Sequence, residues 1–270
     1  MNKTVFTKTD ILNQLQVMGA PTDSVVLMHS SLRAIGNVEG GAEALLDTLI
    51  EYFTRDGGLF CIPTHTWRNM DKDITLDMTS DDNCLGALSG IAIRDGRGIR
   101  SENPTHSMVV FGDRDRALDF ISNEPFVTFG TSADSCYGKL CDMGGKILLV
   151  GVAQNRNTYI HAVEDMLSMP NRVSAESRSV AVKRLSGEIV RRDVFVHLTD
   201  YTSDVSLRYV KYETPFRYHG CITDGFIGNA PTQLCDARKI KETIELICKN
   251  SDEDVLRTEW PIPQNLYCNK

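Results

Sequence analysis

The feature that most constrains the fold is an alternation of short apolar runs and amphipathic stretches early in the chain. The apolar runs at 24–29 and 59–63 are short and bounded by turn residues, which predicts strands covered on both faces. Between them, residues 41–54 place leucines and a phenylalanine at helical spacing. A strand, a helix and a second strand in this order favour parallel strands joined by a crossover helix.

The same kind of pattern continues to the end of the chain. The periodicity predicts helices at 7–18, 85–94, 114–121, 157–168 and 231–249, strands at 108–111 and 146–151, and a hairpin formed by 179–185 and 188–196. Residues 64 to about 105 are irregular and rich in Asp, Asn and Gly, so we expect a long functional loop region there. These elements predict an α/β fold in one domain, 1–270, with the region of about 175–270 packed on it.

Length and composition fit an ordinary globular enzyme. The 270 residues suit one large domain, and 41% apolar with 24% charged residues is typical of globular chains. The net charge is −7 with no cluster of Lys or Arg, which argues against a nucleic-acid partner. No apolar run is long enough to span a bilayer, and residues 1–6 lack the apolar core of a secretion signal. We therefore expect a cytoplasmic protein with no membrane partner.

Cysteines and histidines show no metal or disulfide pattern. The eight cysteines contain no C-x-x-C pair, so we interpret them as reduced thiols. The six histidines form no H-E-x-x-H motif, and we expect no metal. Ser30 and Ser31 follow His29, but no G-x-S-x-G elbow accompanies them, which argues against a serine hydrolase.

Four motifs in a fixed order point to one family. They are His29-Ser30-Ser31-Leu32-Arg33-Ala34-Ile35-Gly36, Pro63-Thr64-His65-Thr66, Arg100-Ser101-Glu102-Asn103-Pro104-Thr105-His106-Ser107, and Asn157-Thr158-Tyr159-Ile160-His161-Ala162-Val163-Glu164. Together they resemble the aminoglycoside 3-N-acetyltransferase family over residues 7 to about 170. The resemblance implies a three-layer α/β/α sandwich with a mixed, largely parallel central sheet and an added β-hairpin region. It also implies an acyl-CoA-dependent N-acyltransferase, with acetyl-CoA or another acyl-CoA as co-substrate, and a homodimer.

The fourth motif carries residues suited to proton transfer. An amine attacks a thioester only without its extra proton, and a histidine is a suitable general base near neutral pH. His161 and Glu164 lie three residues apart on a predicted helix and share one face. From spacing alone, an ordinary surface pair is the better interpretation. The resemblance implies instead that His161 is the catalytic base and Glu164 its partner.

The first three motifs are the expected coenzyme A contacts. The segment after the first strand is by itself no more than a strand–loop–helix turn, although glycines and a helix start suit a phosphate, and hydroxyls or N–H groups there suit a thioester oxyanion. The resemblance implies that coenzyme A contacts His29, Ser30, Ser31, Leu32, Arg33, Gly36, Pro63, Thr64, Arg100, Ser107 and Phe111. Of these, Arg100 is expected beside the phosphates, where a guanidinium pairs well.

Other positions depart from the family pattern or leave it open. Asn103 stands where family members usually carry a histidine. His106 is either a second site histidine or a packed structural one, and His65 is interpreted as a surface loop histidine. Asp77 lies near an acidic residue of antibiotic-modifying relatives, so we include it among the catalytic candidates.

The acceptor amine is open between two classes of amino sugar. The irregular loop region is shorter than in antibiotic-modifying relatives, which favours a nucleotide-linked amino sugar for surface polysaccharide; an aminoglycoside antibiotic is the alternative. Arg68, Lys72 or tyrosines in the cleft would support the former acceptor. A cluster of Asp71, Asp73, Asp77, Asp81 and Asp82 would support the latter. A non-catalytic protein that binds coenzyme A is a lesser alternative.

Overall fold

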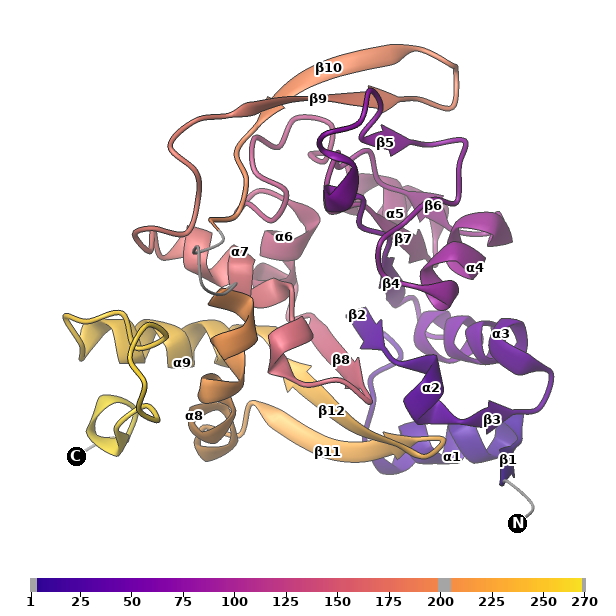
Figure 1. Ribbon diagram of the computed structural model, residues 1–270. Helices are drawn as coiled ribbons and strands as arrows, with labels where there is room; N and C mark the ends of the chain where they lie inside the picture. Colours follow the sequence, from indigo (N-terminus) through magenta and orange to yellow (C-terminus); the bar gives the residue numbers. More distant parts are fainter. Residues whose placement is uncertain (1–3, 199–204, 269–270) are drawn as a thin grey trace.

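The computed structural model describes residues 4–198 and 205–268. Its central element is a seven-stranded sheet with the strand order β11-β12-β8-β2-β4-β7-β6 (Figure 1). The strands are β11 (Ile222–Ile227), β12 (Ala230–Asp236), β8 (Lys146–Val150), β2 (Val25–Ser30), β4 (Leu59–Pro63), β7 (Met108–Phe111) and β6 (Ile99–Arg100). β2 pairs with β8 and β4 in parallel, whereas the outer strands are antiparallel. The sheet is mixed, as predicted, with its parallel pairing confined to the three central strands.

Helices cover both faces of this sheet. One face carries α1 (Lys8–Val17), α3 (Gly41–Thr54) and α4 (Ala87–Asp95), and the other carries α5 (Arg114–Phe120), α6 (Cys136–Asp142), α7 (Tyr159–Met166), α8 (Glu213–Tyr218) and α9 (Ala237–Lys249). Side chains alternate between the two faces along each strand, so Val25 and Leu27 pack into one core while Val26 and Met28 pack into the other. This double burial explains the continuous apolar runs and confirms the three-layer α/β/α prediction.

Local sequence determines where several elements begin. Thr7 caps α1 by accepting a hydrogen bond from the Asp10 amide, while the Asp10 side chain accepts one from the Thr7 amide. The predicted crossover is confirmed, because α3 connects the parallel strands β2 and β4 and has the predicted bounds, Gly41–Thr54. Short elements complete this part of the chain: α2 (Leu32–Ile35), and β1 (Val5–Phe6) paired with β3 (Asn37–Val38).

The prediction of one helix over 231–249 is wrong in its first part. Residues Ala230–Asp236 form strand β12, which lies between β8 and β11 and pairs antiparallel with both. Only Ala237–Lys249 is helical, and its start is fixed by Asp236, whose side chain accepts a hydrogen bond from the Lys239 amide. Thr232, Leu234 and Cys235 are buried by tertiary pairing, which overrides the local helical pattern.

The predicted hairpin is present and forms a second, smaller sheet. β9 (Arg178–Lys183) pairs antiparallel with β10 (Ile189–Val194), and β5 (Leu76–Asp77) joins β9 in parallel. Figure 1 shows this sheet extending over one end of the molecule, beside the irregular loop region. Short 3-10 helices are η1 (Trp67–Asn69), η2 (Gln154–Arg156), η3 (Val205–Tyr212) and η4 (Gln264–Leu266). Within the described residues, no helix combines the length and apolarity needed to cross a bilayer.

Candidate active site

A cavity of about 850 Å³ opens where the three central parallel strands end. His29 and Ser30 at the end of β2, Pro63 at the end of β4 and Val152 just after β8 all line it. Open α/β sheets place their sites at the carboxyl ends of parallel strands, and this volume suits a small-molecule ligand. Residues 195–197, which follow the hairpin, contribute to the opposite wall.

His161 lies in the wall of this cavity with Glu164 beside it, although their spacing alone favoured an ordinary surface pair. They share one face of α7, while Ile160 and Val163 pack into the core on the other side. His161 lines the cavity, and its Nδ1 atom lies 3.3 Å from Glu164 Oε2. The Glu164 side chain is only 1% exposed. A carboxylate so deeply buried needs partners, and it has three.

The first additional partner is Tyr209 on η3, a residue that no sequence motif singled out. Its hydroxyl donates to Glu164 Oε2 at 2.5 Å and lies 2.7 Å from His161 Nδ1. Burial and the neighbouring Glu164 charge raise the pKa of Tyr209 well above its ordinary value, so it keeps its proton. Because that one proton points to the carboxylate, the hydroxyl oxygen accepts from the His161 Nδ1–H. His161 therefore has its basic lone pair on Nε2.

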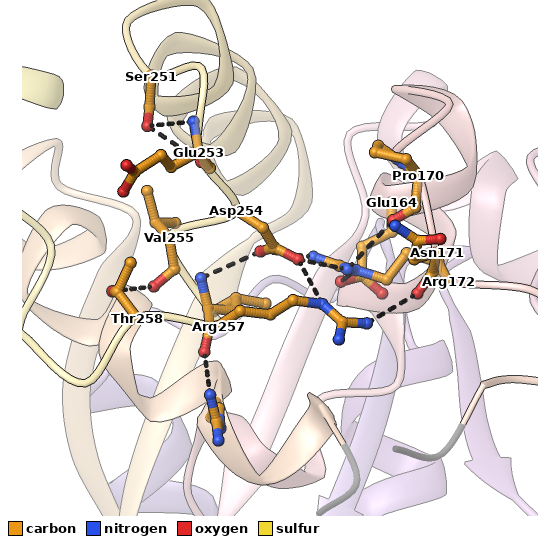
Figure 2. Close-up of polar contacts among 12 residues, drawn as sticks. Glu164, Pro170, Asn171, Arg172, Ser251, Glu253, Asp254, Val255, Arg257 and Thr258 are labelled. Carbon is orange, nitrogen blue, oxygen red and sulfur yellow. Dashed lines mark hydrogen bonds and ion pairs between the residues drawn. The ribbon is translucent and has the colours of Figure 1, made fainter. Parts of the chain in front are cut away.

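The second oxygen of Glu164 is held by Arg172, which follows α7 in the chain. Arg172 donates from Nε to Glu164 Oε1, and its two terminal nitrogens bind Asp254 at 2.7 and 2.9 Å (Figure 2). Arg172 is buried, and its guanidinium is thus enclosed between two carboxylates. Burial lowers the pKa of Arg172, but the hydrogen bond and charge of Asp254 and the charge of Glu164 outweigh it and raise the pKa overall. The arginine is permanently charged. Burial raises the pKa of Asp254 beside it, but the hydrogen bonds and charge of Arg172 outweigh burial and lower that pKa overall.

Three more histidines surround His161, although they are far apart in the sequence. The ring centroids of His161 and His197 are 3.7 Å apart. The ring centroid of His106 lies 5.4 Å from that of His197 and 4.6 Å from that of His65. Burial, followed by the neighbouring His161, lowers the pKa of His106 to about 3. Burial first, and then the other histidines, also hold the pKa values of His65 and His197 well below the ordinary range. These three rings are neutral near pH 7.

His106 and His65 are buried in the cavity wall and are not exposed on a loop. His106 faces the cavity, with its Nδ1 2.9 Å from the Thr105 hydroxyl. His65, interpreted from sequence as a surface residue, is instead 4% exposed, because Tyr137 binds its Nε2 at 2.7 Å from inside the core. Asn103 is fully buried and holds the turn before His106: its Oδ1 accepts from the Thr105 and His106 amides, and its amide donates to Glu124 and Gly130. Asn103, which stands where the family usually has a histidine, therefore stabilises the backbone of this turn.

The expected coenzyme A contacts separate into two groups. His29, Ser30, Ser31, Leu32 and Pro63 line the cavity. Ser31 also caps α2, since its hydroxyl accepts from the Ala34 amide at 3.3 Å. Burial, followed by the charge of Arg156, lowers the pKa of His29 to about 4, and its Nε2 has no hydrogen-bond partner among the described residues. This group presents hydroxyls, amides and one neutral imidazole, which suit a polar thioester ligand.

The other expected contacts do not line the cavity. Outside the lining are Arg33, Gly36, Thr64, Arg100, Ser107 and Phe111. Thr64 and Ser107 are fully buried and bind each other through their hydroxyls at 2.9 Å. The Arg100 guanidinium donates to the carbonyls of Thr64, Ser80 and Asp82. Arg100 thereby connects the end of β4 to the loop at 80–82.

The charged residues of the irregular loop do not form an acidic pocket. Asp77 pairs with Lys183 of the hairpin at 2.9 Å and is not part of the cavity lining, which separates it from His161. Among the described residues, those lining the cavity include no aspartate or glutamate, but they include Arg68, Arg156 and Arg178. Lys72 lies outside the lining, with its ammonium 3.8 Å from Asp82.

The cysteines are free thiols, and one of them lies in the cavity wall. All eight cysteines are free, and Cys84 lies in the cavity wall, where its thiol donates to the His65 carbonyl at 3.1 Å. Across residues 4–198 and 205–268, no group of three His, Cys, Asp or Glu side chains is arranged to hold a metal ion.

Comparisons with known proteins agree with this arrangement. A sequence model of the aminoglycoside 3-N-acetyltransferase family matches residues 27–247. The chain is 25% identical to aminoglycoside N(3)-acetyltransferase IV of Salmonella sp over 240 residues, covering 87% of this chain and 85% of that protein. It is 25% identical to aminoglycoside N(3)-acetyltransferase III of Pseudomonas aeruginosa over 264 residues, covering 87% and 90%.

Solved structures share the fold. A histidine-to-alanine variant of aminoglycoside acetyltransferase AAC(3)-IVa, in complex with a gentamicin, superposes with a TM-score of 0.75 at 23% identity, covering 90% of this chain and 88% of that one. A binary complex of AAC-IIIb with CoASH gives a TM-score of 0.73 at 21% identity, covering 88% and 94%. The family model spans most of the chain. The chain belongs to the aminoglycoside 3-N-acetyltransferase family and is an acyl-CoA-dependent N-acyltransferase.

Proposed function

We propose that this protein transfers the acetyl group of acetyl-CoA to an amine of an aminoglycoside, with His161 as the general base. The observation that carries the proposal is the chain of hydrogen bonds from His161 Nδ1 through Tyr209 to Glu164 at the cavity floor. It leaves Nε2 as the proton acceptor and supplies a buried negative charge to stabilise the imidazolium that forms.

The reaction needs one proton to move and one bond to be exchanged. The neutral amine attacks the thioester carbonyl, and a C–N bond forms while the amine proton passes to His161 Nε2. The C–S bond then breaks, and the sulfur leaves with that proton as free coenzyme A. We place the thioester against Ser30, Ser31 and Leu32, because these residues line the cavity at the end of β2. Hydroxyl and amide donors of this segment would stabilise the oxyanion.

The choice of acceptor follows the relatives. The shortened loop favoured a nucleotide-linked amino sugar, but the relatives and the solved gentamicin complex favour the aminoglycoside alternative. One observation supports the nucleotide-linked sugar as a second candidate. The cavity lining contains Arg68, Arg156 and Arg178 without a carboxylate among the described residues, and such a wall suits an anionic group better than a polycation.

An acceptor panel tests the proposal and separates the two candidates. The protein is incubated with acetyl-CoA and either gentamicin-type aminoglycosides or nucleotide-linked amino sugars, and loss of the thioester absorbance is followed, with mass spectrometry of the product. Acetylation of an aminoglycoside supports the proposal. Acetylation of nucleotide-linked sugars alone replaces it with the second candidate. Lack of acetylation of every acceptor contradicts both, and His161→Ala protein serves as the background control.

A further inference from the structure

Glu164 divides its two oxygens between different partners, and this division is what orients the base. Oε2 receives the Tyr209 hydroxyl and faces His161 Nδ1, whereas Oε1 receives a single hydrogen bond from Arg172 Nε. A guanidinium beside a carboxylate prefers to bind both oxygens through two parallel N–H groups. If Arg172 did so here, it would compete with Tyr209 and His161 for Oε2.

Asp254 prevents that competing geometry. It lies in the segment 251–258 that follows α9, and its two oxygens accept from both terminal nitrogens of Arg172 at 2.7 and 2.9 Å. The two-pronged end of the guanidinium is thus directed away from Glu164, and only Nε remains for Oε1 (Figure 2). Arg172 has a side chain only 4% exposed, so solvent cannot take the place of this partner.

Asp254 is itself held rigidly. Its Oδ1 accepts from the Leu256 amide at 3.1 Å, and its Oδ2 accepts from Arg257 Nε at 3.1 Å. Arg257 also reaches back to the Asn171 carbonyl at 3.3 Å, next to Arg172 (Figure 2). The C-terminal segment is therefore connected through these polar contacts to the end of α7.

We propose that Asp254 is a positioning residue for acyl transfer, which directs Arg172 so that Glu164 keeps Oε2 on Tyr209 and His161. The inference rests on the proposed role of His161 as base. It also has an electrostatic consequence, because Asp254 places a negative charge behind Arg172, near the imidazole, where Arg257 only partly offsets it. Removing the charge of Asp254 makes the imidazolium of His161 less stable and moves its titration to lower pH.

The titratable and charged groups around His161 come from several elements. They are Glu164 on its own helix, Tyr209 and Tyr212 on η3, His65, His106 and His197 from the cavity wall, Cys248 on α9, and the Arg172–Asp254 pair with Arg257. Among them, Asp254 is a carboxylate that touches neither His161 nor the cavity lining. Neutralising it therefore changes the titration of His161 without altering a direct contact to the ring, through Arg172 and Glu164 and through the loss of the charge itself.

The test uses Asp254→Asn with a matched control. Asp224 accepts hydrogen bonds from both terminal nitrogens of Arg217, at 2.7 and 3.0 Å. This pair is far from His161 in the sequence and lies outside its cavity. Asp224→Asn therefore removes the same kind of pair elsewhere in the protein. His161 is followed by NMR of histidine-labelled protein, with its resonance assigned by the loss of signal in His161→Ala. Kinetics with acetyl-CoA and the best acceptor run in parallel.

We expect the midpoint of the His161 titration to fall by about half a pH unit in Asp254→Asn and by more in Glu164→Gln. kcat should fall about fivefold in Asp254→Asn while KM for acetyl-CoA is unchanged, and Arg172→Lys should lower kcat with little movement of the midpoint, because the charge remains. Asp224→Asn should change neither quantity.

Two outcomes would overturn the inference. One is an unchanged His161 midpoint in a folded Asp254→Asn protein, as judged by its thermal unfolding. The other is a shift of equal size in Asp224→Asn, which would show a general effect of losing an ion pair. Because the NMR titration needs no acceptor, it gives a result even if every acceptor fails, and such a failure would count against the proposed function instead.

Discussion

His161 is the residue on which the proposed chemistry of the site depends. Its Nδ1 is held by Tyr209 near Glu164, and its Nε2 is the remaining proton acceptor. The adjacent rings of His65, His106 and His197 are kept neutral by burial, so they do not compete for the proton near pH 7. One base is thereby selected from a group of four similar side chains.

Replacing His161 by alanine should abolish turnover while leaving coenzyme A binding nearly intact, because its proposed role is proton transfer and not donor binding. The measurement is kcat with acetyl-CoA and the responding acceptor, together with calorimetric binding of coenzyme A. Retention of more than about a tenth of the wild-type rate would remove His161 from the mechanism, since a general base contributes about 10²- to 10⁴-fold.

Tyr209→Phe should lower kcat about tenfold with KM nearly unchanged. The substitution removes the hydroxyl that accepts from His161 Nδ1 and donates to Glu164, a loss of about 1–2 kcal/mol in orienting the base. Tyr218→Phe is the matched control, because Tyr218 is 57% exposed and lies outside the cavity lining. A Tyr209→Phe enzyme with the full rate would show that Glu164 alone suffices to orient His161.

The sequence indicated the candidate base but not the residues that contact it and its partner. His161 and Glu164 were predictable because they share a motif and one helix face. Tyr209, Arg172 and Asp254 come from three other segments, and no local pattern marks them, since only the fold brings them to Glu164. The motif of Arg100 predicts a phosphate contact, and in the structure its guanidinium donates to loop carbonyls.

Among the helices and strands, most bounds could be predicted where a single hydrophobic period dominates the local sequence. α3 and β7 have the bounds that their apolar spacing indicates, and the predicted β9–β10 hairpin is present. The region at 230–249 was mispredicted because a strand is followed by a helix without a turn between them. Asp236 is the single residue that marks the change, as the last residue of β12 and the cap of α9.

Asp236→Ala should destabilise the protein by about 1–2 kcal/mol. The Asp236 side chain accepts from the Lys239 amide at the start of α9 and pairs with Lys146 at the start of β8, so both the helix cap and an interstrand contact are lost. Urea unfolding followed by circular dichroism measures the change. Asp236→Asn, which keeps a capping oxygen, should lose less; an equally large loss in both variants would assign the effect to the ion pair and contradict the capping role.

At the scale of the whole molecule, buried neutral histidines make folding sensitive to acid. The pKa of His29 is lowered to about 4, by burial and then by Arg156, and that of His106 to about 3, by burial and then by His161. The pKa values of His65 and His197 are also held well below the ordinary one. The unfolded chain binds protons at these positions near pH 6.5, whereas the folded chain does not until the pH is much lower.

We therefore expect stability to be full above about pH 6.5 and to fall as the pH decreases toward the folded-state pKa values. Each such histidine contributes a slope of at most about 1.4 kcal/mol per pH unit. The free energy of unfolding, measured in urea at pH 7.5 and 5.5, should decrease by more than about 1 kcal/mol. His29→Gln should have a smaller decrease than the wild type. Equal stability at the two pH values would mean that these rings are not neutral in the folded state.

Cys84 is a free thiol at which the cavity can be labelled. Its half-buried thiol lies in the cavity wall, while the five fully buried cysteines, at 61, 136, 141, 221 and 235, sit in the core. An environment-sensitive fluorophore attached at Cys84, in a variant in which Cys248 and Cys268 are replaced by serine, would stand inside the space that the acceptor and donor share. Its emission would report ligand entry directly, so acceptors could be ranked by affinity even when they are not acetylated.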